Sequence, residues 1–204
     1  MSRPPLSSRP LSCSPLTLFL AFSLAIAGCD RDAPSEAQGS AAQAAAEGEV
    51  DRSFTGEPLP AVNLSDPQGR VLDMGALRGT PVLLNLWATW CAPCVKEMPQ
   101  LDELAARYPD RLAVVAASQD VQGAKAVEPF FARTDLKNLD PWLDPQNRLM
   151  EGLGAEGLPV TILYDVNGQE VWRMTGPFDW ASEEAFALVE EGFADVPGSG
   201  EVAP

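Results

Sequence analysis

Two cysteines three residues apart, Cys91 and Cys94, are the residues of this chain best suited to chemistry. They lie in the segment Trp87–Pro99, which reads WATWCAPCVKEMP. A pair at this spacing serves as a metal clip, as a structural disulfide, or as a redox couple that alternates between dithiol and disulfide. The chain contains four cysteines and no histidine, and this count bears on all three alternatives.

The chain begins with a pattern typical of export. Arg3 and Arg9 precede the apolar run Leu16–Ala27, as in a secretory signal peptide. This run is too short to cross a bilayer as a helix, which takes about 20 residues. We therefore expect residues 1–28 to be a signal peptide.

The end of this segment, Ile26-Ala27-Gly28-Cys29, resembles the lipobox of bacterial lipoproteins. The resemblance implies cleavage before Cys29, acyl chains on that cysteine, and retention of the mature protein on a membrane. Asp30 directly after it suggests, again by resemblance, retention at the periplasmic face of the inner membrane. The alternative is ordinary signal cleavage beside a cysteine that carries no lipid.

Export would leave a single free cysteine pair. Cys13 would leave with the signal peptide and Cys29 would carry lipid, so Cys91 and Cys94 remain. Zinc and iron–sulfur sites take about four soft or imidazole ligands, so we expect no metal. A peroxidatic cysteine is commonly preceded, three positions earlier, by Thr or Ser, but Ala88 stands there. Thiol–disulfide exchange is the favoured chemistry, in an oxidising compartment where the pair forms a disulfide by default.

Composition indicates one medium-sized domain. The chain has 204 residues, of which 46% are hydrophobic and 21% charged, enough for one core plus some unstructured sequence. The formal net charge is −15, and because residues 1–28 hold two arginines and no acid, the remainder carries −17. This argues against nucleic-acid binding, which requires a basic surface. The acidity favours solubility, or steering toward basic partner surfaces.

The chain divides into four parts. After the signal peptide, residues 29–56 comprise the lipidated cysteine and a stretch rich in Ala, Glu, Gly and Ser that predicts a flexible tether. Residues 57–195 contain the apolar runs of one folded domain, and residues 196–204 form a polar, disordered tail.

Hydrophobic patterning predicts an α/β domain. The order is a hairpin, a buried strand, a helix, a second buried strand, two further helices, a second hairpin and a terminal helix that Ser182 caps. The ranges are 61–64 with 70–74, 81–88, 94–108, 112–118, 123–133, 146–152, 160–165 with 169–174, and 182–191. This order predicts a layered sandwich with a mixed central sheet.

The cysteine pair directly follows the buried strand 81–88 and opens the next helix. Cys91 is therefore expected at the positive end of the helix dipole, among unpaired N–H groups that stabilise its thiolate. Cys94, one turn later on the same face, can close the disulfide or resolve a mixed one. Pro93 fits a first-turn position and limits how far the two sulfurs can separate.

Trp-Cys-x-Pro-Cys after an apolar strand, with Pro99 five residues beyond the second cysteine, resembles thioredoxin. More narrowly, Asn85–Pro99 is similar to the TlpA/ResA/CcmG group of membrane-tethered bacterial thioredoxin-like proteins. The similarity extends over about residues 57–193 and includes Gly157–Asp165 and Gly176–Trp180. It implies a thioredoxin-like three-layer sandwich of class α/β, with a mixed central sheet and an added N-terminal β-hairpin.

The resemblance also implies site residues. Pro159 matches the family's cis-proline, which packs against the disulfide and leaves the backbone of Leu158 free to pair with an extended substrate. Glu97 occupies the acidic position of the Cys-x-x-Cys-x-x-Glu pattern, where it would exchange protons with the buried thiol; the alternative is a solvated helix charge. Trp90 would border the disulfide and the substrate.

Asn85 departs from thioredoxin, which has an aspartate six residues before the first cysteine. Because an amide takes no proton there, proton transfer would rest on Glu97 or water.

The favoured interpretation is a membrane-anchored, extracytoplasmic protein-disulfide oxidoreductase that reduces partner proteins with cysteine pairs. In the family this serves cytochrome c maturation or oxidase copper-site assembly. Electrons would come from a membrane thiol donor, because no Gly-x-Gly-x-x-Gly motif is present for a nicotinamide or flavin; no cofactor beyond the redox-active disulfide is expected. Two alternatives are a disulfide-donating oxidase with the same site, and a lipoprotein adaptor whose disulfide is a staple.

Overall fold

The computed structural model describes residues 48–194. The expected signal peptide, Cys29, the tether up to residue 47 and the tail at 196–204 lie outside the described residues. In chain order the elements are β1 (Glu49–Asp51), β2 (Asn63–Ser65), β3 (Val71–Asp73), η1 (Met74–Leu77), β4 (Val82–Trp87), α1 (Ala92–Arg107), β5 (Ala113–Ser118), α2 (Ala124–Arg133), β6 (Trp142–Leu143), α3 (Arg148–Leu153), β7 (Val160–Tyr164), β8 (Glu170–Thr175), α4 (Glu183–Glu190) and η2 (Glu191–Phe193).

The strands form one mixed sheet in the order β1-β8-β7-β4-β5-β6-β2-β3. β4 lies at its centre, parallel to β5 and antiparallel to β7. Every residue of β4 is buried, as expected of a nearly continuous apolar run in a strand covered on both faces. The predicted mixed sheet is confirmed.

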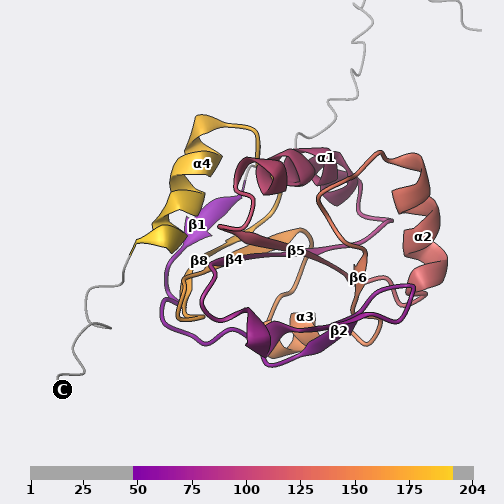
Figure 1. Ribbon diagram of the computed structural model, residues 1–204, viewed down its shortest axis with the longest axis horizontal. Coiled ribbons are helices and arrows are strands. Elements are labelled where there is room, and N and C mark those ends of the chain that lie inside the picture. The colour runs from indigo at the N-terminus through magenta and orange to yellow at the C-terminus, as the bar shows by residue number, and fades with distance from the viewer. Residues whose placement is uncertain (1–47, 195–204) are drawn as a thin grey trace, which may run out of the picture. The chain divides into compact units, whose positions relative to one another are not determined.

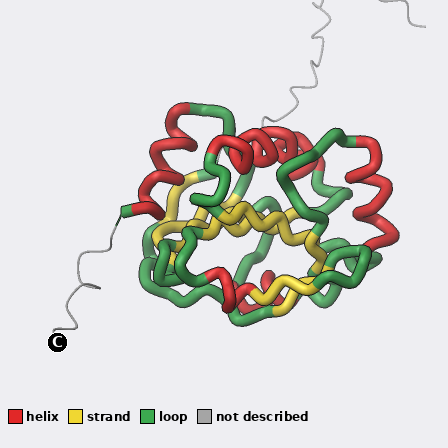
Figure 2. Tube along the Cα trace, in the orientation of Figure 1, coloured by secondary structure: helices red, strands yellow, loops and turns green. Residues whose placement is uncertain are grey.

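Helices cover both faces of this sheet (Figures 1 and 2). α1, α2 and α4 pack on one face, around a cluster that includes Met98, Phe130 and Val189. α3 lies on the other face, where Leu149 packs in a second cluster with Leu64 of the hairpin. Successive residues of β4 alternate between the two clusters, because strand side chains point to opposite faces in turn. The predicted three-layer sandwich is therefore confirmed.

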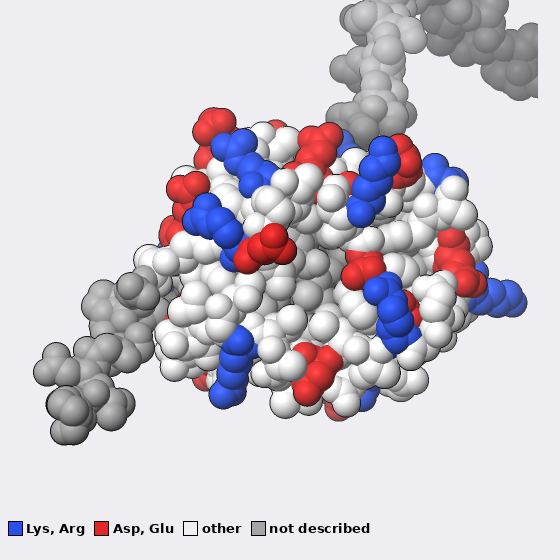
Figure 3. Space-filling view, in the orientation of Figure 1, with Lys and Arg blue, Asp and Glu red and all other residues white. Residues whose placement is uncertain are grey.

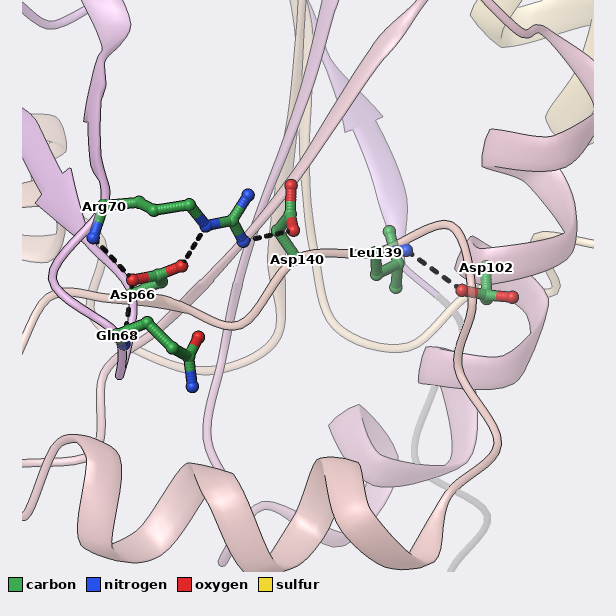
Figure 4. Close-up of polar contacts among 6 residues, drawn as sticks. All are labelled: Asp66, Gln68, Arg70, Asp102, Leu139 and Asp140. Carbon is green, nitrogen blue, oxygen red and sulfur yellow. Dashed lines mark hydrogen bonds and ion pairs between the residues drawn. The ribbon is translucent and has the colours of Figure 1, made fainter.

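The predicted N-terminal hairpin is also confirmed, as β2 paired with β3. In its turn, Asp66 accepts hydrogen bonds from the backbone amide of Arg70 at 2.7 Å and from its guanidinium, which also reaches Asp140 at 2.7 Å (Figure 4). The hairpin joins the main sheet where Ser65 pairs with Leu143. Leu143 belongs to strand β6, which has only two residues and was not predicted.

One prediction about domain limits is wrong. Residues 49–51, which we expected to belong to the tether 29–56, form β1 and pair with β8. Arg52 then makes a bidentate ion pair with Glu191, at 2.7 and 2.9 Å. An edge strand is held by backbone hydrogen bonds, so this segment needs few apolar side chains, and its polar composition gave no sign of a strand.

The remaining elements lie close to their predicted positions. α1 ends at Arg107, and the short helix begins at Arg148 instead of 146. Ser182 caps α4 as predicted, because its hydroxyl accepts a hydrogen bond from the amide of Ala185 at 3.0 Å.

A buried carboxylate on α1 holds the segment that leads from α2 to β6. Asp102 Oδ1 accepts hydrogen bonds from the amides of Lys137, Asn138 and Leu139 at 2.9, 2.7 and 3.0 Å, and Figure 4 shows the one from Leu139. Its Oδ2 accepts another from the side-chain amide of Asn138 at 2.9 Å. This single side chain therefore holds three consecutive backbone amides of the connection.

We expect Asp102→Ala to lower the free energy of unfolding by about 2–4 kcal/mol, because three backbone amides, one of them buried, lose their carboxylate acceptor. Urea denaturation of the disulfide-bonded protein measures this loss. The matched control is Glu103→Ala, at the next and exposed position, which should stay within about 0.5 kcal/mol of the wild type. Equal effects of the two substitutions would contradict the role given to Asp102.

Candidate active site

The two cysteines lie where α1 begins, at the carboxyl ends of two parallel strands. β4 and β5 are paired up to Trp87 and Ser118, and four residues after Trp87 comes Cys91. Cys91 and Cys94 form a disulfide with their Cα atoms 5.3 Å apart, and both are buried. Cys91 is the N-cap of α1, where its sulfur accepts a hydrogen bond from the amide of Cys94 at 3.3 Å. The predicted placement at a helix N-terminus is confirmed.

A buried aspartate that was not predicted from the sequence holds the loop that leads into Cys91. Asp120 accepts hydrogen bonds from the amide and the hydroxyl of Thr89 at 2.9 and 2.7 Å, and from the hydroxyl of Ser118 at 2.8 Å. It thereby ties the loop after β4 to the end of β5. The available signal was the polar run Ser118-Gln119-Asp120 directly after a buried strand.

The prolyl segment lies at the same edge of the sheet. The peptide bond between Leu158 and Pro159 is cis, which confirms that part of the prediction. Because Val160 pairs with Leu86 in antiparallel register, Pro159 lies beside the end of β4, from which the cysteine loop starts. Leu158 precedes β7 and takes no part in its pairing with β4 or β8.

Glu97 is buried one turn beyond Cys94, with 3% of its surface exposed. It is therefore not a solvated helix charge. Its Oε1 accepts a hydrogen bond from the amide of Phe178 at 2.6 Å, whereas Oε2 has no partner among residues 48–194. Burial raises the pKa of Glu97 to about 7, and the Phe178 amide and the nearby Trp180 indole lower it only in part.

A carboxyl group with this pKa is populated in both protonation states near neutral pH. It is therefore suited to give and take protons, which is what general acid–base chemistry requires.

The other polar and aromatic residues of the cysteine segment differ in how far they are buried. Asn85 is buried and donates a hydrogen bond to the Thr161 hydroxyl at 3.0 Å, so its amide is engaged in the sheet. Trp87 is fully buried, and its ring centroid lies 4.9 Å from that of Phe130, so it packs in the core. Trp90 is 71% exposed; it lies at the surface before Cys91 and leaves most of its ring in solvent.

Within residues 48–194, no group of three or more His, Cys, Asp and Glu side chains is arranged to hold a metal ion. No helix in the same range is long and apolar enough to cross a membrane. On the face shown in Figure 3, acidic and basic side chains are interspersed, and neither sign forms a broad patch.

Comparisons with known proteins agree on the family of this chain. The redoxin family matches residues 54–189. The thiol-disulfide oxidoreductase ResA of Bacillus cereus is 31% identical over 121 residues, which cover 59% of this chain and 69% of that protein. ResA of Geobacillus thermodenitrificans is 35% identical over the same length, with the same coverage.

A solved structure shows the same fold. The crystal structure of a Chlorobium tepidum protein assigned as thiol:disulfide interchange protein DsbE superimposes with a TM-score of 0.62 at 25% identity. The superposition covers 68% of this chain and 96% of that one.

The raised pKa of Glu97 makes the stability of the protein depend on pH. The folded protein holds this proton up to about pH 7, whereas the unfolded chain releases it near the ordinary value of 4.5. The stabilisation is therefore complete below pH 4.5 and is lost as the pH rises to 7, by about 3 kcal/mol. We expect this loss in the disulfide-bonded wild type relative to Glu97→Gln.

Urea denaturation of both proteins at several pH values between 4 and 8 measures this difference. The other titrating groups contribute equally to the free energy of unfolding of both proteins, so their contributions cancel. A difference between the two that stays constant over this range would show that Glu97 titrates normally.

Proposed function

The chain belongs to the redoxin family and is a thiol–disulfide oxidoreductase of the ResA type, and from that premise we propose that it reduces disulfides in partner proteins outside the cytoplasm. The observation that carries the proposal is the arrangement on α1. A disulfide lies at the N-terminus of this helix, and a buried carboxyl group follows one turn later.

In the proposed reaction, the reduced protein attacks first through Cys91. Its thiolate forms a bond to one sulfur of the partner disulfide, and the other partner sulfur leaves as a thiolate. Cys94, as a thiolate, then attacks the sulfur of Cys91, which releases the partner as a dithiol and closes the Cys91–Cys94 disulfide. Two electrons and two protons from a membrane thiol donor return the protein to its dithiol form.

The position of the two sulfurs supports this division of roles. Cys91 is at the end of the helix where N–H groups stabilise a thiolate, and is the more accessible of the two, at 6% exposure against 1% for Cys94. Glu97 would accept the proton of the Cys94 thiol during resolution and return it during reduction.

The position of Glu97 supports one direction of electron flow over the other. A buried carboxylate close to a thiol disfavours the thiolate, because like charges repel. A dithiol whose thiolates are less stable is a stronger reductant, since oxidants of this fold owe their potential to a stabilised reduced form. This favours the reductase over the disulfide-donating oxidase.

Partner binding would involve the surface around the disulfide. Leu158, outside the strand pairing, would pair by its backbone with an extended segment of the partner, beside Pro159. Trp90 is exposed and would contact apolar side chains of that segment.

The place of action is proposed from the N-terminal sequence. Cys29 would carry lipid and hold the protein at the periplasmic face of the inner membrane, where the donor would also reside. The partners would be proteins with cysteine pairs, in cytochrome c maturation or in assembly of oxidase copper sites.

The Cys94→Ser variant tests the reaction. Without the resolving thiol, the mixed disulfide on Cys91 should persist, so partners should be retained covalently and released by dithiothreitol. Non-reducing electrophoresis followed by mass spectrometry identifies them. The double variant Cys91→Ser, Cys94→Ser is the control and should retain none. Equal retention by both variants would favour an adaptor that binds without exchange.

The midpoint potential of the Cys91–Cys94 pair tests the direction. We expect a reductant, with a midpoint of about −250 mV or lower, against about −120 mV for strong periplasmic oxidants. Glu97→Gln should make the midpoint less negative, by about 30 mV for each tenfold stabilisation of the dithiol. Titration in glutathione and dithiothreitol buffers measures both values, and a wild-type midpoint near that of the oxidants would reverse the assignment.

A further inference from the structure

The loop between β8 and α4 covers Glu97. We call residues 176–180, Gly-Pro-Phe-Asp-Trp, the 176–180 loop. Its middle residue, Phe178, donates the hydrogen bond that Glu97 accepts. At its start, the amide of Gly176 donates to the carbonyl of Pro159 at 2.9 Å. The same five residues therefore contact both the prolyl segment and the acid.

The far end of the loop is fixed to α1. Gln100 accepts a hydrogen bond from the amide of Trp180 at 3.3 Å and donates one to Asp179 at 2.9 Å. Gln100 is one turn beyond Glu97, so the loop spans the stretch of α1 that contains the acid. The ring of Phe178 meets that of Trp180 edge to face at 5.2 Å.

The centre of the loop is also held by Gly48, the first residue that the structure describes. Gly48 donates a hydrogen bond from its amide to the carbonyl of Pro177 at 2.7 Å, directly before the amide that binds Glu97. β1 then continues along β8, with Val50 opposite Met174.

Gly48 leaves no room for a side chain. A Cβ atom there would lie 2.5 Å from Cγ of Met174 and 3.1 Å from the carbonyl oxygen of Gly176. Met174 is 1% exposed, so its side chain has little freedom to move. Close approach of β1 to the 176–180 loop therefore depends on glycine at this position.

We propose that β1 and Gly48 position the acid: they hold the 176–180 loop closed against Glu97 and so keep water from its carboxyl group. The segment is a positioning element, because Gly48 contacts the loop and not the reacting atoms. Its effect on catalysis rests on the proposed role of Glu97 in thiol exchange, but the closure of the loop does not.

Loosening the loop would have two opposed effects on Glu97. Water would reach the carboxyl group, which lowers its pKa, and the Phe178 hydrogen bond would weaken, which raises it. Burial is the larger cause of the present value, so the pKa should fall toward its ordinary range.

Other titrating groups around the loop do not oppose this change. Asp179 in the loop, and Glu49 and Asp51 on β1, are exposed. Arg173 on β8 is paired with Glu170 at 2.7 Å. In the disulfide-bonded protein the two cysteines on α1 do not titrate.

The experiment compares Gly48→Val with Gly152→Val in the full, disulfide-bonded chain. A Cβ atom at Gly152 would have nothing within 4 Å, so this position is a matched control for the same substitution. Carbon-13 NMR of the Glu97 carboxyl group gives its pKa, and hydrogen exchange of the Phe178 amide reports closure of the loop. Both readouts are independent of redox activity.

In Gly48→Val we expect the pKa of Glu97 to fall by about one unit or more, and the Phe178 amide to exchange at least about tenfold faster. Gly152→Val should match the wild type in both. Arg52→Gln, which removes only an exposed ion pair of the same segment, should shift both readouts in the same direction by less, and it keeps the test available if Gly48→Val does not fold.

An unchanged or raised pKa with unchanged amide exchange in a folded Gly48→Val protein would overturn the proposal. A lowered pKa with faster amide exchange, but with an unaltered rate of thiol exchange, would support the positioning by β1 and would instead reject Glu97 as the proton donor and acceptor.

Discussion

The burial of one carboxyl group is the constraint around which this end of the molecule is organised. Removing Glu97 from water disfavours its charged form, and the Phe178 amide and the nearby Trp180 indole offset only part of that effect. The group can stay buried only while the 176–180 loop remains in place above α1. Contacts with Pro159, Gln100 and Gly48 hold this loop, so the acid depends on segments from the whole length of the described chain.

The first two turns of α1 carry two electrostatic influences of opposite sign. The helix N-terminus favours negative charge on the sulfur of Cys91, and a charged Glu97 would disfavour it on Cys94. The two thiols of the reduced protein would thus differ because of their places at the start of one helix. Asp120 adds to this by geometry, since its hydrogen bonds to Thr89 fix the loop that leads into Cys91.

Sequence patterning predicted the fold well where side chains determine it. The buried run of β4, the hairpins and the Ser182 cap each depend on local residue types, and all are present. β1 was not predicted, because backbone pairing to a sheet edge needs no particular side chain. Asp120 and the 176–180 loop were not recognised as parts of the site either, since their contacts join segments distant in sequence.

Among the site residues, too, the features set by local sequence were predicted and those set by distant segments were not. Spacing placed Cys91, Cys94 and Glu97 on one helix, but it did not distinguish a buried acid from a solvated one, because that depends on a loop about 80 residues further on. Reduction of the disulfide takes up protons at the sulfurs, and oxidation releases them. In the proposed mechanism, a carboxyl group that changes protonation near pH 7 would supply and recover such a proton without an opening to bulk water at each step, and the 176–180 loop would keep it in that state.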